Sequence, residues 1–139
     1  MSVSIPAELR RRIRAHFLLR CAYCRSSEAL TVVTFEIEHI HPTSLGGRTE
    51  FKNLCLVCPS CNRHKANRIT GYTDEGIESR LFHPQRDHWL DDFDWSVNGT
   101  LLVGLTEIGL ATVNLLQMNR SQMVEVRSLW AIVGKHLSS

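Results

Sequence analysis

The chain has 139 residues, of which 43% are hydrophobic and 22% are charged. Such a composition supports a packed core and argues against a wholly disordered chain. No apolar run approaches the roughly 20 residues that a membrane-spanning helix needs. The first residues also lack the basic and then apolar stretches of a signal peptide. We therefore expect a cytoplasmic protein with no membrane partner.

The net charge of +2 hides a difference between the two halves of the chain. Residues 1–70 contain 11 Lys or Arg and 5 Asp or Glu, whereas residues 71–139 contain 5 and 9. A basic first half indicates a polyanionic partner, and nucleic acid is the commonest one. Charge alone leaves an ordinary solvated surface as an equal alternative.

The first half predicts a helix, two strands and a second helix. The first helix is expected over residues 6–20, where Pro6 is tolerated in the first turn. The β-branched run at residues 30–37 predicts a strand, and the glycine-containing residues 43–52 predict a loop. A short strand is expected at residues 54–57, and proline-initiated residues 59–67 predict the second helix.

The second half predicts a hairpin and two helices. Residues 71–86 are polar and predict an irregular segment. Asn98-Gly99 lies between β-type runs at residues 93–97 and 100–103, a pattern typical of a hairpin with a two-residue turn. Thr106 is expected to cap a helix, and a last helix with the same apolar spacing follows it.

Four of the five cysteines form two short-spaced pairs, Cys21 with Cys24 and Cys58 with Cys61. Two such turns can supply the tetrahedral thiolate ligands that structural zinc prefers. Redox chemistry would need one pair beside a βαβ pattern, and this chain has two pairs without that pattern. The sequence therefore predicts a zinc site, with Cys55 outside it as a small buried apolar residue.

Three further motifs lie between and after these pairs, in a fixed order: Glu38-His39, Asn53-Leu54, and the run from Asn62 to Lys65 that follows Cys61. Together with the cysteines they resemble the HNH endonuclease family, the zinc-bearing branch of the ββα-metal, or His-Me finger, nucleases. The resemblance covers roughly residues 6–70. It is specific because the acidic-His pair, Asn-Leu and Cys-Asn-x-x-Lys all occur in the family's order.

The resemblance implies a role for each matched residue. It implies that His39 is the general base for phosphodiester hydrolysis, a task that suits neutral imidazole near pH 7. It implies that Glu38 and Asn62 hold a divalent ion, Mg²⁺ or Mn²⁺, through hard oxygen ligands. Asn53 would fix the position of the histidine by bonding backbone across the long loop. Glu38 departs from the more frequent Asp or His, and Asn62 from the histidine that names the motif.

Other polar residues of the first half are candidates for substrate contacts. Glu36 shares a strand face with Glu38 and is expected to be solvated. His41 could reach the site or be structural, and the two alternatives are equally supported. The residues expected to grip phosphates of DNA, which we expect to be double-stranded, are Arg10, Arg11, Arg14, Arg48, Lys52, Arg63, Lys65 and Arg68.

We therefore expect an α+β fold: a ββα-metal core with an N-terminal helix and a four-cysteine zinc site, followed by a C-terminal hairpin and two helices. Residues 1–75 would form the nuclease domain and residues 76–139 an extension. The expected activity is that of a DNA endonuclease, and the alternative is a non-catalytic zinc module that binds nucleic acid. The apolar faces of the last two helices could cover the core or form a homodimer.

Overall fold

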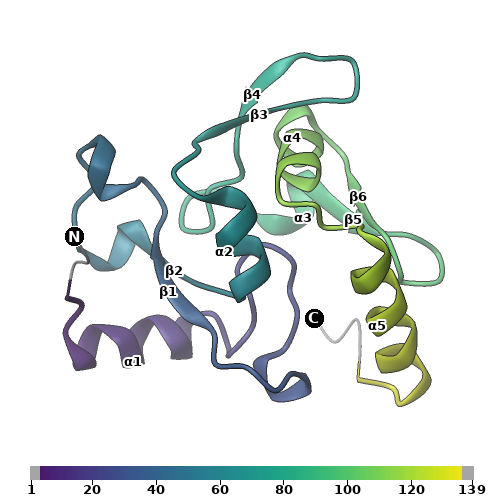
Figure 1. Cartoon of the computed structure of the whole chain (residues 1–139), viewed down its shortest axis with the longest axis horizontal. Helices are drawn as coiled ribbons and strands as arrows, with labels where there is room; N and C mark the ends of the chain where they lie inside the picture. Colours follow the sequence, from purple (N-terminus) through teal and green to yellow (C-terminus); the bar gives the residue numbers. More distant parts are fainter. Residues whose placement is uncertain (1–3, 136–139) are drawn as a thin grey trace. The chain divides into compact units, whose positions relative to one another are not determined.

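The computed structural model describes residues 4–135, which fold into two compact units (Figure 1). The first unit comprises the described residues through Ile69 together with the short segment His83–Asp87. The second comprises Thr70–Phe82 and the described residues from His88 onward. The units therefore interleave along the chain, and the functional boundary expected after residue 75 stays a prediction. Within residues 4–135, every helix is too short or too polar to cross a bilayer.

The first unit is built on two antiparallel strands followed by a helix. Strand β1 (Glu36–His39) pairs with β2 (Leu54–Val57), and helix α2 (Pro59–Lys65) packs against β1. Helix α1 (Ala7–His16) packs against β2. Three short 3-10 helices complete the unit: η1 (Glu28–Leu30), η2 (Thr43–Leu45) and η3 (Phe51–Asn53).

Strand β2 lies at the centre of the first unit's core. All four of its side chains are buried, as expected for the continuous apolar run that it contains. Ile13 of α1 and Phe17 just after it are also buried. Strand β1, by contrast, alternates: Glu36 is exposed and Glu38 is buried. The polar residues of β1 are thus held by a rigid apolar strand on one side.

The second unit contains two hairpins and three helices. Its antiparallel pairs are β3 with β4 and β5 with β6. In chain order its elements are β3 (Thr70–Tyr72), β4 (Glu78–Arg80), α3 (Trp89–Asp92), β5 (Phe93–Trp95), β6 (Leu102–Gly104), α4 (Glu107–Leu115) and α5 (Ser121–Ile132). Its core contains an aromatic cluster: the ring of Phe93 lies 5.2 Å from those of Phe82 and Trp89.

This architecture confirms the expected α+β class, the β-β-α core, the hairpin at residues 93–104 and the two C-terminal helices. The hydroxyl of Thr106 accepts a hydrogen bond from the Gly109 amide and caps α4, as expected. The hairpin turn, however, is longer than the two residues expected. Asn98 there uses its side-chain oxygen to accept hydrogen bonds from the hydroxyls of Ser96 and Thr100, so local polar groups rather than the Asn-Gly step alone shape the turn.

Two other segments differ from the expectation. The first strand begins at Glu36 rather than at residue 30, because residues 28–30 form a 3-10 turn and the Thr31 hydroxyl donates to nearby backbone oxygens. Residues 71–86 are not wholly irregular, since β3 and β4 form a hairpin there. A Cβ on Gly71 would lie 2.9 Å from the Ala111 carbonyl oxygen, so the close approach of this hairpin to α4 requires glycine.

Candidate functional site

The four paired cysteines converge on one buried point of the first unit. The ligand atoms of Cys21, Cys24, Cys58 and Cys61 all lie within 4.8 Å of one another. The Sγ atoms of Cys24 and Cys58 are 3.8 Å apart, close to the edge of a tetrahedron with metal–sulfur bonds of about 2.3 Å. All five cysteines are free thiols. The four donors therefore suit a single tetrahedral metal ion.

Two backbone turns hold the cysteine pairs in place. The first turn is tied to the core because the amide of Ala22 donates to the carbonyl of Leu56 in β2, at 2.8 Å. The second turn opens α2, with Cys58 as its N-cap residue. There the amide of Cys61 donates to the Sγ atom of Cys58, at 3.4 Å. The cysteine cluster thus links the turn that follows α1 to the start of α2.

The electrostatics of the cluster favour a thiolate at Cys24. Hydrogen bonds from the neighbouring thiols, that of Cys21 first, hold the pKa of the Cys24 thiol well below its ordinary value. The hydroxyl of Ser26, 3.2 Å from the same sulfur, acts in the same direction. Because the thiolate is the form that binds metal, the site carries a ligand prepared for coordination.

Two carboxylates of β1 face two side chains of α2. The side-chain amide nitrogen of Asn62 donates to the carboxylate of Glu36, and Lys65 Nζ lies 3.3 Å from Glu38 Oε1. Alternate residues of a strand share a face, as do residues three apart in a helix. The amide oxygen of Asn62 accepts no hydrogen bond from any residue in the described part of the chain. It therefore remains available to a cation.

Glu38 lies in a protected environment, with 8% of its side chain exposed. Its Oε1 atom is buried and ion-paired with the ammonium of Lys65, while its Oε2 atom lies 3.7 Å from the thiol of Cys55. Burial raises the pKa of the Glu38 carboxyl to about 7, although the ammonium of Lys65 opposes this shift. A carboxylate oxygen on β1 and an amide oxygen on α2 are the kind of hard donors that suit a divalent ion.

His39, at the end of β1, is oriented by a residue of the following loop. Its Nε2 atom lies 2.8 Å from the hydroxyl of Thr49. Burial lowers the pKa of the His39 imidazole below its ordinary value, which favours the neutral ring. When a neutral ring donates from Nε2 to Thr49, its Nδ1 atom keeps the lone pair that can accept a proton.

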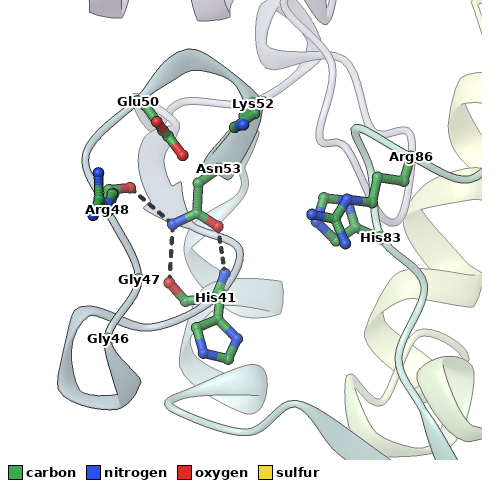
Figure 2. A pocket seen from close by; sticks show the side chains of 9 residues that line it. All are labelled: His41, Gly46, Gly47, Arg48, Glu50, Lys52, Asn53, His83 and Arg86. Atoms are coloured by element: carbon green, nitrogen blue, oxygen red, sulfur yellow. Dashed lines mark hydrogen bonds between the residues drawn. The ribbon is translucent and has the colours of Figure 1, made fainter.

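The loop after His39 is fixed by the side chain of Asn53 (Figure 2). The Oδ1 atom of Asn53 accepts a hydrogen bond from the amide of His41 at 2.9 Å. Its Nδ2 atom donates to the carbonyl oxygens of His41, at 3.0 Å, and Arg48, at 2.9 Å. Because the side chain bonds to both backbone groups of His41, it holds the chain two residues after His39.

The eight basic residues proposed for phosphate contacts have different environments. The half-buried Arg14 forms an ion pair with Glu28. Lys65 is only 2% exposed, and its ammonium donates to the carbonyl of Ile40 rather than facing solvent. The remaining six are exposed: Arg10, Arg11, Arg48, Lys52, Arg63 and Arg68.

Three features of this region were not expected from the sequence. Glu36 is exposed but contacts α2, and its shared strand face with Glu38 was the available signal. The contact of Thr49 with His39 had no sequence signal, because it depends on the path of the loop. The segment His83–Asp87 joins the first unit because the side-chain amide of Gln85 donates to two backbone carbonyls within residues 51–54.

Comparisons with known proteins agree with this geometry. A family model described as HNH endonuclease matches residues 21–68, which contain the four clustered cysteines, β1, β2 and α2. The Septu protein PtuA of Bacillus mycoides (strain KBAB4) is 26% identical over 144 residues, covering 86% of this chain and 20% of that protein. The chain thus spans about a fifth of the length of this relative. No solved structure matches the chain significantly. Residues 21–68 of this chain therefore resemble an HNH endonuclease domain.

Proposed function

We propose that the chain is a metal-dependent DNA endonuclease that hydrolyses phosphodiester bonds. The observation that carries this proposal is the pair of oxygen donors on adjoining elements, Glu38 on β1 and Asn62 on α2, within an HNH domain. His39 follows Glu38 directly and carries an imidazole whose pKa is lowered by burial. A base and two hard oxygen ligands are the groups that such hydrolysis needs.

Each residue has a separate task in this proposal. His39 acts as the general base and removes a proton from the attacking water, with Thr49 holding its ring. Glu38 and Asn62 hold Mg²⁺ or Mn²⁺, which would stabilise the negative charge that gathers on the phosphoryl and leaving oxygens. Asn53 keeps the loop, and through it His39, in position. Lys65 supports the carboxylate of Glu38 from the buried side.

We also propose that the ion at Cys21, Cys24, Cys58 and Cys61 is Zn²⁺ with a structural role. Four thiolates and no open position are typical of structural rather than catalytic zinc. The exposed basic residues of the first unit would grip the backbone of double-stranded DNA without reading its sequence. Affinity for duplex should then fall steeply as salt rises.

A nicking assay with supercoiled plasmid tests the proposed activity. Wild-type protein with Mg²⁺ or Mn²⁺ should convert the plasmid, and His39→Ala should lower the rate by at least about 100-fold, because a general base contributes on that order. His64→Ala serves as the matched control. This imidazole lies on α2 with Nδ1 2.8 Å from the Ser60 carbonyl, so its loss should leave the rate within about two-fold.

The assay also separates the alternative, a non-catalytic zinc module that binds nucleic acid. Such a module needs the cysteines but has no use for His39. Equal residual nicking by wild type and His39→Ala, at equal zinc content, would favour the module and reject the endonuclease. Loss of activity in both His variants would point to a general effect on folding and likewise count against a specific role for His39.

We further propose that a cytoplasmic homodimer forms through the C-terminal helices. Helix α5 buries Met123 and Trp130 but exposes Leu129 and Ile132, whose side chains are 58% and 78% accessible. Leu129 and Ile132 are three residues apart on the helix, so they share a face that would pack against a second copy. Sedimentation of the protein should then give twice the chain mass, and Leu129→Asp should shift it to the monomer.

A further inference from the structure

An open pocket of about 320 Å³ lies beside the loop that follows β1 (Figure 2). All of its lining residues belong to the first unit. Figure 2 shows His83 and Arg86 on one side of it, and the loop from His41 to Asn53 on the other. The charged and titratable side chains that line it are His41, Arg48, Glu50, Lys52, His83 and Arg86.

The lining is strongly cationic. Arg48, Lys52 and Arg86 supply three full positive charges, and Glu50 is the single carboxylate among the lining residues. In the described part of the chain, none of these three cations takes part in an ion pair or donates a side-chain hydrogen bond. Like charges gathered in one concave site repel one another, and a bound anion would relieve that repulsion.

The two sides of the pocket are fixed to each other by hydrogen bonds. The side-chain amide of Gln85 donates to the carbonyls of Phe51, at 3.0 Å, and Leu54, at 2.9 Å. This anchors the turn that carries His83 and Arg86 against the end of the loop. These hydrogen bonds of the folded core therefore hold the segment that carries Arg86 near the loop that carries Arg48 and Lys52.

The imidazole of His83 is also oriented. Its Nδ1 atom accepts a hydrogen bond from the amide of Gln85 at 3.2 Å. The neutral ring must then carry its proton on Nε2, which makes Nε2 a donor. Two forked guanidinium groups and an ammonium form a set that suits the several oxygens of a phosphate.

We propose that this pocket binds a phosphate group of the nucleic-acid substrate, through Arg48, Lys52 and Arg86. This inference rests on the proposed function, because it takes nucleic acid as the substrate. Arg48 and Lys52 lie on the same loop that Asn53 fixes after His39. A phosphate in the pocket would therefore hold the strand at a set position relative to the reacting linkage.

The test uses binding of a short duplex to the cleavage-disabled His39→Ala protein, followed by fluorescence anisotropy at several salt concentrations. Arg86→Ala in this background should weaken binding about ten-fold, as expected for loss of one charge-assisted contact. It should also reduce the slope of log affinity against log salt by about one. Arg120→Ala, which removes the same charge from the second unit, should change the affinity less than two-fold.

The side chain of Arg86 is exposed, so its replacement should leave zinc content and circular dichroism unchanged. Equal duplex affinity and salt slope for Arg86→Ala and Arg120→Ala would overturn the proposal. So would binding of inorganic phosphate, seen as a shift of the His83 ring signals in NMR, together with an unchanged duplex affinity, since the pocket would then serve a free anion.

These outcomes are distinct from failure of the proposed function. If wild type does not nick plasmid while Arg86→Ala still weakens duplex binding, the endonuclease proposal fails and the phosphate pocket stands. If wild type nicks plasmid while Arg86→Ala binds duplex as the control does, the pocket proposal fails and the endonuclease proposal stands.

Discussion

At the scale of single residues, Glu38 is buried, and yet its carboxyl must be ionised to bind a divalent ion. It is 8% exposed, and burial raises the pKa of its carboxyl to about 7. A divalent ion needs the ionised carboxylate as its ligand. In the proposed site, a proton and the metal ion would compete for the same oxygens, and the buried position would shift this competition into the neutral pH range.

This competition predicts how metal affinity depends on pH. The pKa of the Glu38 carboxyl is raised, so the folded protein keeps that proton up to about pH 7. Apparent affinity for Mn²⁺ should therefore rise about ten-fold per pH unit below 7 and level off above it. The check is the Mn²⁺ concentration that gives half-maximal nicking at pH 6, 7 and 8. A value independent of pH over this range would contradict the assigned role of Glu38.

The order of the motifs along the sequence was enough to predict the residues whose roles the HNH resemblance implies. Asn53, for example, bonds to backbone on both sides of the loop, which is the role that the resemblance implied. Contacts that depend on the course of the loop were not accessible in this way, as with Thr49 beside His39. The environment of Lys65 could not be predicted for another reason. Helical periodicity shows which face of α2 carries Lys65, but only the packing shows that this face is buried against Glu38 instead of facing solvent.

At the scale of elements, the connection between β1 and β2 depends on two adjacent glycines with different constraints. Gly47 lies against the backbone, and a Cβ there would be 1.8 Å from the carbonyl oxygen of His41. Gly46 has a φ of +93° with no heavy atom near an added Cβ. Position 47 thus needs glycine because a side chain has no space there, and position 46 needs it because the backbone has a positive φ.

Substitution of these glycines should separate the two constraints. Gly47→Ala forces a backbone atom to move and should destabilise the first unit by about 3 kcal/mol. Gly46→Ala meets only conformational strain and should cost about 1 kcal/mol. Urea-induced release of zinc, followed with a chromogenic chelator, reports unfolding of the first unit. Equal midpoints for the two variants would show that the close approach to His41 is not a constraint in solution.

Elements with strong local sequence signals could be predicted from the sequence. Strand β2 was expected at residues 54–57 and lies at Leu54–Val57, because its buried run is bounded by loop residues and by a helix-starting proline. The strand expected at residues 30–37 shows the limit of local propensity. There a 3-10 turn and the carboxylate of Glu28, which accepts from the amide of Phe35 at 2.7 Å, hold the chain away from a sheet.

At the scale of the whole molecule, the cysteine cluster links segments that are distant in the sequence. Cys21 and Cys24 follow α1, whereas Cys58 and Cys61 begin α2. The first unit contains few strands and a small core, so binding of the metal should supply much of its folding free energy. The same linkage holds β1 and α2, and therefore the proposed site, in one arrangement.

Removal of the metal should therefore abolish structure and activity together. The purified protein should contain about one zinc ion per chain, and a strong zinc chelator should unfold the first unit and stop nicking, both restored by added Zn²⁺. Cys24→Ala should lower the zinc content, while Cys55→Ala, at a buried cysteine outside the cluster, should retain it. Retention of full nicking activity after complete loss of zinc would contradict the structural role of the ion.

The proposed activity depends most on one divalent ion held by Glu38 and Asn62 beside His39. Anomalous diffraction from a crystal of the His39→Ala protein, grown with Mn²⁺ and a short DNA duplex, tests it directly. We expect a manganese peak within about 2.0–2.3 Å of a Glu38 carboxylate oxygen and the Asn62 amide oxygen, with a phosphate oxygen of DNA completing the site. A manganese peak bound elsewhere, with Glu38 still paired to Lys65, would contradict it.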